Sequence, residues 1–284
     1  MTYAELAAAL EFVLAEAGVE RAGRLAEDYF ADARIRPPDA RPSDVADLEH
    51  VVRVEADADR LIAGEPLQYV TGVAHFFGHA LSVGPAVLVP RPETEELVRW
   101  ILEREPADRL FFADLCTGSG CIAAALAYAR EPWRGLAVDV SADAVGYATR
   151  NARSLAVGDY VRVEQHDVLR DEEYLGVGGE WDLLVSNPPY IPDEDWLRVD
   201  PAVAAYEPHL ALRVSDEDPL IFYRRLAELA ARHLVPGGRL YAECNDRYTA
   251  RVGELFRERG MGEVDVLVDM QGRPRHVRAV VGSA

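Results

Sequence analysis

Three short motifs in this sequence carry residues that could bind and orient a ligand. The first is ADLCTGSGCIA, where a glycine-rich turn stands between an expected strand and an expected helix. Glycines in such a turn let a ligand approach the backbone closely, and open α/β sheets bind ligands at the carboxyl ends of their strands. We therefore expect a ligand to contact the five residues of the turn, Cys116, Thr117, Gly118, Ser119 and Gly120.

Acidic residues end the next two expected strands. Asp139, nineteen residues after Gly120, is expected to accept hydrogen bonds from the two hydroxyls of a ribose; it could also cap the helix that follows at once. Asp167 is expected to hold an adenine amino group, with Val168 packed on the adenine face, although a loop-capping role suits Asp167 too. NAD and S-adenosylmethionine both contain adenosine, and GSGCIA matches the dinucleotide fingerprint, so these features leave both cofactors open.

The third motif, Asn187-Pro188-Pro189-Tyr190, stops the apolar run LLVS. Proline fixes its own backbone and restricts the residue before it, so the Asn187 side-chain carbonyl and a proline backbone carbonyl can converge, with Tyr190 as a flat wall. Two such acceptors bind both hydrogens of a planar NH2 group and aim its lone pair at an electrophile. Methyl transfer to that nitrogen uses this arrangement, whereas hydride transfer does not. We assign Asn187 and Pro188 to catalysis and all four residues to substrate binding; an ordinary strand terminator is the simpler alternative.

The elements that must position these motifs alternate between strand and helix. Expected strands are 110–116, 135–140, 161–166, 181–186, 239–244, 264–269 and 277–281, and expected helices are 93–105, 121–130, 142–155, 219–234 and 248–259. Repeated β-α units indicate a parallel sheet covered on both faces, and the short MQGRPR link predicts an antiparallel last strand. The long segment from Asn187 to Pro219 is expected to be functional.

The residues before this alternation read differently. Residues 1–73 are expected to form a small helical domain, with helices at about 6–17, at 21–33 and from a Ser43 cap to Gly64. Residues 74–92 hold short apolar runs at 76–77, 81–83 and 86–89, broken by glycine and proline, and these favour a linking β-hairpin.

Composition excludes several classes of function. All 30 basic residues are arginine, against 49 acidic residues and a formal charge of −19. The lack of lysine excludes Schiff-base chemistry and lysine-dependent phosphate loops, and the acidity argues against direct nucleic-acid binding. The chain has three cysteines, Cys116, Cys121 and Cys244, and no apolar run of about 18 residues. We expect a cytoplasmic monomer with reduced thiols, no metal site and no membrane span.

VSNPPYI after DLCTGSGCIA resembles the S-adenosylmethionine-dependent methyltransferases that modify planar nitrogens. With GEPLQYVTGVAHFFG and VLVPRPETEELV, the chain resembles the PrmC/HemK-type protein-(glutamine-N5) methyltransferases. The resemblance implies an α/β fold, with a Rossmann-like, mostly parallel sheet at 93–284, a hairpin linker at 74–92 and a substrate-recognition domain at 1–73. It implies S-adenosylmethionine at Cys116 to Gly120, Asp139, Val168 and Asn187. The implied substrate is the Gly-Gly-Gln loop of peptide chain release factors.

The chain departs from the family pattern in three places. Cys116 stands where glycine is more usual, Val168 where an aromatic residue is frequent, and AECNDRY replaces a Glu-Ile-Gly type segment. We expect in-line methyl transfer without a strong general base, because the nitrogen proton becomes acidic only after alkylation. A glutamine in a ribosomal protein, adenine in DNA, NAD chemistry and a catalytically dead binding module are the alternatives.

Overall fold

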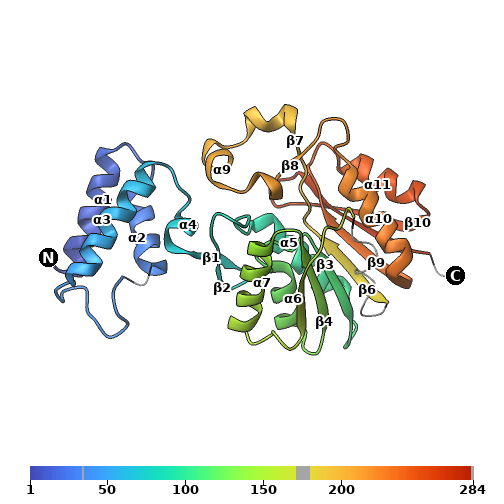
Figure 1. Ribbon diagram of the computed structural model, residues 1–284, viewed down its shortest axis with the longest axis horizontal. Helices are drawn as coiled ribbons and strands as arrows, with labels where there is room; N and C mark the ends of the chain where they lie inside the picture. The colour runs from blue at the N-terminus through green and yellow to red at the C-terminus, as the bar shows by residue number, and fades with distance from the viewer. Residues whose placement is uncertain (34, 171–179, 283–284) are drawn as a thin grey trace.

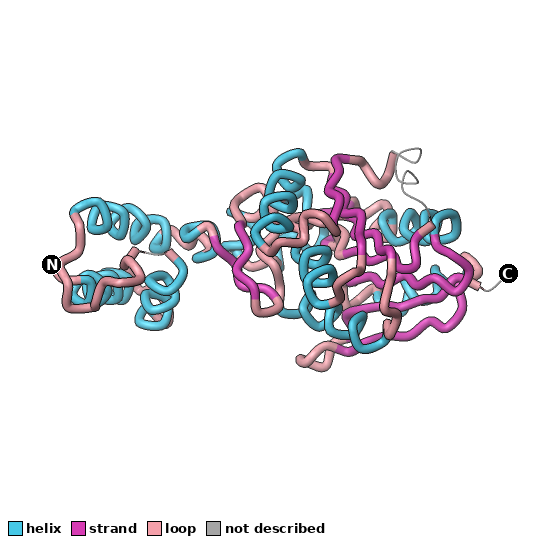
Figure 2. Tube along the Cα trace, turned by 90° about the horizontal axis from the view of Figure 1, so that it is seen from below, coloured by secondary structure: helices cyan, strands magenta, loops and turns pink. Residues whose placement is uncertain are grey.

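The N-terminal helices form around apolar residues spaced one turn apart. A computed structural model describes residues 1–33, 35–170 and 180–282, so the expected domain at 93–284 includes two short ranges outside the described residues. The helices are α1 (Tyr3–Glu16), α2 (Ala22–Asp32), α3 (Leu48–Ile62) and α4 (Leu67–Thr71). Leu6, Leu10 and Leu14 of α1 are buried in their shared core. Figures 1 and 2 show this bundle to one side of the sheet along the long axis of the molecule.

The prediction that Ser43 caps the third helix is wrong. Helix α3 begins five residues later, at Leu48. The segment before it is held against the start of α1 instead: Tyr3 N–H donates to Asp44 O at 3.1 Å, and Thr2 pairs with Val45. Main-chain pairing with the N-terminus has therefore taken this segment out of the helix.

The expected hairpin is present, but its outer run is not a strand. Strands β1 (Val73–Phe76) and β2 (His79–Ser82) pair antiparallel around Phe77 and Gly78, whose positive φ angles suit a two-residue turn. The run 86–89 was expected to be β-like and is irregular. Its backbone meets distant side chains: the Val87 carbonyl accepts from the Tyr69 hydroxyl at 2.6 Å, and Val89 N–H donates to Glu207 at 3.1 Å.

Within the residues that the structure describes, the sheet has seven strands in the order β10-β11-β9-β6-β3-β4-β5. Their bounds are β3 (Phe111–Leu115), β4 (Arg134–Asp139), β5 (Val161–Gln165), β6 (Trp181–Ser186), β9 (Leu234–Glu243), β10 (Met261–Val268) and β11 (Pro274–Val281). Of these described strands, β11 alone runs antiparallel to the rest, pairing with β9 and β10. This confirms the predicted mostly parallel sheet with an antiparallel last strand.

Helices cover both faces of the sheet, as a parallel sheet requires. On one face α5 (Pro92–Arg104), α6 (Cys121–Ala129) and α7 (Ala142–Ser154) pack with alternate strand residues such as Phe112 and Ala137. On the other, α10 (Ile221–His233) and α11 (Thr249–Glu258) pack with the intervening residues, such as Leu115 and Leu136. None of the helices in the described ranges is long and apolar enough to cross a membrane.

The segment after β6 is more ordered than the expected loop. It contains β7 (Ile191–Pro192), the 3-10 turns η1 (Asp193–Arg198) and η2 (His209–Ala211), α9 (Pro201–Tyr206) and β8 (Arg213–Val214). In Figure 1 it arches beside the carboxyl ends of the strands and reaches toward the helical bundle. The Tyr206 hydroxyl donates to the Ala63 carbonyl at 2.9 Å. The segment thus touches both parts of the chain.

Candidate active site

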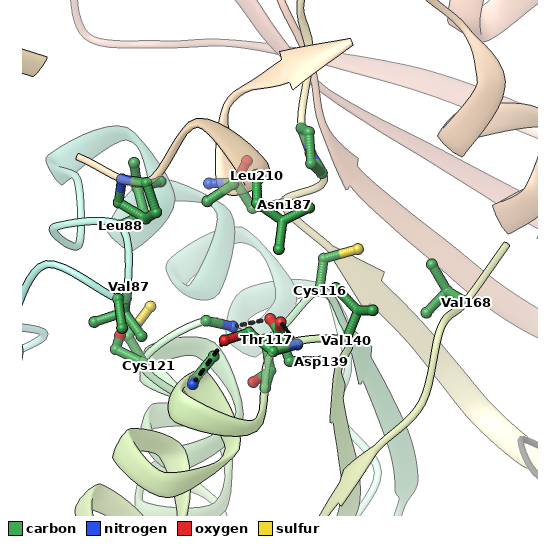
Figure 3. A pocket seen from close by; sticks show the side chains of 18 of the residues that line it. Val87, Leu88, Cys116, Thr117, Cys121, Asp139, Val140, Val168, Asn187 and Leu210 are labelled. Carbon is green, nitrogen blue, oxygen red and sulfur yellow. Dashed lines mark hydrogen bonds between the residues drawn. The ribbon is translucent and has the colours of Figure 1, made fainter. Parts of the chain in front are cut away.

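A cavity of about 370 Å³ opens at the carboxyl edge of β3, β4, β5 and β6. Ligands bind at this edge of open α/β sheets, at the point where the strand order reverses. Figure 3 shows Cys116, Asp139, Val168 and Asn187 around it. Of the residues expected at the site, the lining includes Cys116, Thr117, Gly118, Ser119, Asp139, Asp167, Val168, Asn187 and Pro189. Gly120, Pro188 and Tyr190 are not part of the lining.

The two glycines of the turn serve different purposes. Gly118 has φ +56°, and a Cβ there would meet no atom within 4 Å, so it leaves open space at the cavity. A Cβ on Gly120, by contrast, would lie 2.9 Å from the Ala148 backbone. Gly120 therefore allows α6 to pack closely against α7. The neighbouring Asn151 donates to the Ser119 carbonyl at 2.8 Å and to the Ser82 carbonyl at 3.0 Å, which ties the turn to β2.

The Asp139 carboxylate supports the turn and lines the cavity. It accepts hydrogen bonds from Gly118 N–H at 2.9 Å and from Ser141 N–H at 3.0 Å. Burial raises the pKa of Asp139 above its ordinary value, while these two N–H groups act in the opposite direction. The cap of α7 is Ser141, whose hydroxyl accepts from Ala144 N–H. The carboxylate thus holds the turn at the cavity wall, with further acceptor capacity for a ligand.

Asp167 and Val168 follow β5 at the same edge. Asp167 accepts from Leu169 N–H at 2.9 Å, which is the loop-capping contact that its alternative role required. Val168 is 6% exposed, and its carbonyl accepts from Arg225 at 2.7 Å. Both residues line the cavity, so Asp167 makes the capping contact and also stands at the cavity wall.

Hydrogen bonds to other parts of the chain hold the corner from Asn187 to Tyr190 in place. Asn187 Nδ2 donates to the Thr94 hydroxyl at 3.1 Å, and the Tyr190 hydroxyl donates to Glu243 at 3.2 Å. Tyr190 N–H donates to the Leu212 carbonyl at 3.2 Å, which joins the corner to the segment after it. Pro188 is buried. The arrangement leaves the carbonyl end of the Asn187 side chain available at the cavity.

Sequence reasoning missed much of the remaining lining. The segment before α5 contributes Val87, Leu88, Pro90 and Arg91, and the first turn of α5 contributes Thr94. The far side is formed by Leu210, Ala211 and Phe222. The Arg91 guanidinium forms an ion pair with Glu207, whose side chain is 1% exposed, and this pair fastens the segment after β6 to the start of α5. The PRPETE motif was the available signal, because it contains both Arg91 and Thr94.

Cys116 has φ +62°, a left-handed backbone that favours glycine. We expect Cys116→Gly to be more stable than Cys116→Ala by about 0.5–1 kcal/mol, the reverse of the usual order at ordinary φ. Both variants lack the thiol, so their difference isolates the backbone. Chemical denaturation of the two proteins checks this, and a more stable alanine variant would show that the turn is not strained at Cys116.

A buried carboxyl beneath the turn should make stability depend on pH. Burial raises the pKa of Asp114 to about 7, against the opposing effect of donors from Thr117 and Ala123. The ordinary pKa of an aspartate is near 4. The stabilisation that the folded protein gains from protonated Asp114 is therefore complete below about pH 4 and is lost as pH rises through about 7. Asp114→Asn is expected to lose less free energy of unfolding than the parent between about pH 5 and about pH 8. Denaturation curves across this range test it; equal pH slopes would count against a raised pKa.

Comparisons with known proteins point to one chemistry. The family model of the methyltransferase small domain matches residues 95–199. A release factor glutamine methyltransferase of Bacteroides thetaiotaomicron is 39% identical over 220 residues, covering 78% of this chain and 77% of that protein. One of Mycolicibacterium smegmatis is 39% identical over 263 residues, covering 92% and 85%. A solved methyltransferase from Pyrococcus furiosus shares the fold, with a TM-score of 0.53, 20% identity and coverage of 82% and 98%.

Proposed function

The chain belongs to the release factor glutamine methyltransferase family, and from this premise we propose that it methylates the side-chain amide nitrogen of a glutamine in a peptide chain release factor. The resemblance implies that this glutamine belongs to a Gly-Gly-Gln loop. The observation that carries the proposal is the Asn187 amide, held by Thr94 at the wall of a cavity that also contains the glycine-rich turn. One cavity thus contains both an acceptor for a planar NH2 group and a glycine-rich turn that could bind a nucleoside.

The residues at the cavity fit S-adenosylmethionine. Gly118 leaves open space beside the turn, and the Asp139 carboxylate can accept from ribose hydroxyls. Asp167 and Val168 stand where the adenine is expected, although valine offers less stacking surface than an aromatic ring. When bound, the cofactor supplies a methyl group that is already activated by its sulfonium.

The protein's own part is positioning and polarisation. Asn187 Oδ1 and a proline backbone carbonyl would accept the two hydrogens of the substrate amide, which turns its lone pair toward the methyl donor. Of the two prolines, Pro189 lines the cavity, whereas Pro188, the one expected from the sequence, does not. Tyr190 is held beside them by its hydrogen bond to Glu243. Leu210 and Phe222 supply apolar wall on the far side of the cavity, and apolar walls exclude water from the reacting groups.

We further propose that the helical unit, residues 1–73, helps to hold the protein substrate. Its contacts with the rest of the chain support this role. The Tyr206 hydroxyl joins the segment after β6 to Ala63, and His75 of the hairpin lies 2.7 Å from Asp32 of α2. A release factor bound at the cavity would also contact this helical unit. Because the proposed partner is a release factor, we propose that the chain acts in the cytoplasm.

A competition experiment tests the proposed substrate. The purified chain is mixed with labelled S-adenosylmethionine and equal amounts of an unmodified release factor and an unmodified ribosomal protein that carries a methylatable glutamine. We expect early label in the release factor alone. Label in the ribosomal protein instead would overturn the substrate assignment, and calorimetric binding of NAD in place of S-adenosylmethionine would overturn the chemistry.

A further inference from the structure

A buried carboxylate lies behind the Asn187-to-Tyr190 corner, at the end of β9. Glu243 is 1% exposed, and hydroxyl groups from two different elements meet its two oxygens. Thr94 of α5 donates to Oε2 at 2.7 Å, and Tyr190 donates to Oε1 at 3.2 Å. His276 Nε2 lies 3.7 Å from Oε2, beyond hydrogen-bond distance. One carboxylate therefore accepts from Tyr190 of the corner and from Thr94, which contacts Asn187.

The direction of these hydrogen bonds fixes the Asn187 amide. A carboxylate that accepts at both oxygens requires Thr94 to donate its single hydroxyl hydrogen to Glu243. The Thr94 oxygen can then only accept, and of the two ends of the Asn187 amide only the NH2 group can donate to it. The carbonyl end is consequently turned away from Thr94. Among the residues that the structure describes, none donates a hydrogen bond to this Oδ1.

We propose that Thr94 and Glu243 are positioning residues that hold the Asn187 carbonyl toward the methyl-accepting nitrogen. This inference rests on the proposed function for its substrate and on the hydrogen bonds alone for its geometry. If the Asn187 amide turned over, its NH2 group would face the NH2 group of the substrate, and two donors would oppose each other. The hydrogen bonds that run from Asn187 to Thr94 and from Thr94 to Glu243, here called the relay, exclude that arrangement. The same carboxylate holds the Tyr190 ring in place.

The relay predicts different behaviour for two substitutions of one residue. Thr94→Val keeps the shape of the side chain and removes the hydroxyl, whereas Thr94→Ser keeps the hydroxyl and removes a methyl group. Thr94→Val is expected to lower kcat for methyl transfer by about 10- to 100-fold, which matches the loss of one buried charge-assisted hydrogen bond. Thr94→Ser is expected to retain most of the activity. Both variants should bind S-adenosylmethionine as the parent does.

Thr249→Val is the matched control, because Thr249 is also buried and its hydroxyl shares its single hydrogen between the carbonyls of Asn245, at 3.1 Å, and Pro274, at 3.0 Å. It should lower the melting temperature and leave kcat and KM unchanged. If Thr94→Val proves unfolded, Thr94→Ala replaces it. Activity lost equally in the Thr94 and Thr249 variants would reduce the role of Thr94 to general stability and overturn the proposal.

The orientation of Asn187 can be read without any turnover. The chain has only three asparagines, Asn151, Asn187 and Asn245, so selective asparagine 15N labelling gives few side-chain NH2 signals, which Asn245→Asp and Asn187→Asp assign. We expect slow hydrogen exchange for the Asn187 NH2 group in the parent and in Thr94→Ser, and fast exchange in Thr94→Val. The buried Asn151 serves as the internal reference.

The two readouts separate the inference from the proposed function. Parent protein that leaves release factors unmethylated would overturn the proposed substrate, and the Asn187 signals would still decide the relay. An Asn187 NH2 group that exchanges equally in the parent and in Thr94→Val would overturn the relay, even with full methyl transfer in the parent.

Discussion

Asn187→Ala is expected to lower kcat for methyl transfer by about 10²- to 10³-fold while leaving S-adenosylmethionine affinity within a few-fold of the parent. The side chain lies at the cavity wall with its NH2 group given to Thr94. Its carbonyl is the acceptor that would orient the substrate nitrogen. Removing one pre-organised hydrogen-bonding group from an active site has an effect of this size. Single-turnover rates combined with calorimetry of cofactor binding measure both quantities.

A second asparagine provides the control for this substitution. Asn245 lies beyond the end of β9, where its side chain accepts from Arg247 N–H at 3.1 Å, and Asn245→Ala should leave kcat unchanged. If Asn187→Ala keeps the parental rate, the acceptor assigned to Asn187 does not orient the substrate. If it loses cofactor affinity to the same extent as rate, the residue belongs to cofactor binding alone.

Asp139→Ala is expected to weaken S-adenosylmethionine binding by about 10- to 100-fold. The variant would lose a charge-assisted hydrogen bond to the ribose, worth roughly 1.5–3 kcal/mol, which corresponds to a factor of this size. It would also release the N–H groups of Gly118 and Ser141, which the carboxylate holds at 2.9 and 3.0 Å. Calorimetry with S-adenosylmethionine and with its demethylated product reports the effect, which should be alike for both because they share the ribose.

Asp269→Ala is the matched control for the loss of a buried carboxylate. Asp269 is 4% exposed and accepts from the N–H groups of Gln271 and Arg273, in the turn between β10 and β11. This variant should lose stability and retain cofactor affinity. Parental affinity in Asp139→Ala would remove the ribose role and leave Asp139 as a support for the turn.

The sheet and the ends of its strands could be predicted because their signals are local. Successive residues of β3, such as Phe112 and Ala113, pack on opposite faces of the sheet, and the apolar run is readable from the sequence. Strands β3, β4, β5 and β6 each have their glycine, aspartate or asparagine at the carboxyl end or within three residues after it. Parallel strands bring these residues to one edge. Most of the cavity lining expected from the motifs is accordingly present there.

The rest depends on contacts between residues far apart in the chain. Thr94 and Glu243 are 149 residues apart and form the support behind Asn187. Val89 N–H finds its acceptor in Glu207, which is why an apolar run that looked like a strand is irregular. Ser43 is a suitable cap by residue type, yet pairing between Thr2 and Val45 moves the start of the helix. Local patterns carry no information about such partners.

Gly120 shows a subtler limit. Its place in a glycine-rich turn suggested contact with a ligand, but a Cβ there would meet the Ala148 backbone of α7 at 2.9 Å. The same residue type at Gly118 leaves open space at the cavity instead. A pattern identifies a position that needs glycine, and only the surrounding helices reveal which physical demand it satisfies.

Fragment mass spectrometry of a release factor incubated with the chain and S-adenosylmethionine tests the central claim most directly. The expected result is one added methyl group on the side-chain amide of the Gly-Gly-Gln glutamine. It should be absent when that glutamine is replaced and strongly reduced with Asn187→Ala. A methyl group on another residue, or an unmodified release factor despite bound cofactor, would contradict the assignment of the Asn187-to-Tyr190 corner as a glutamine pocket.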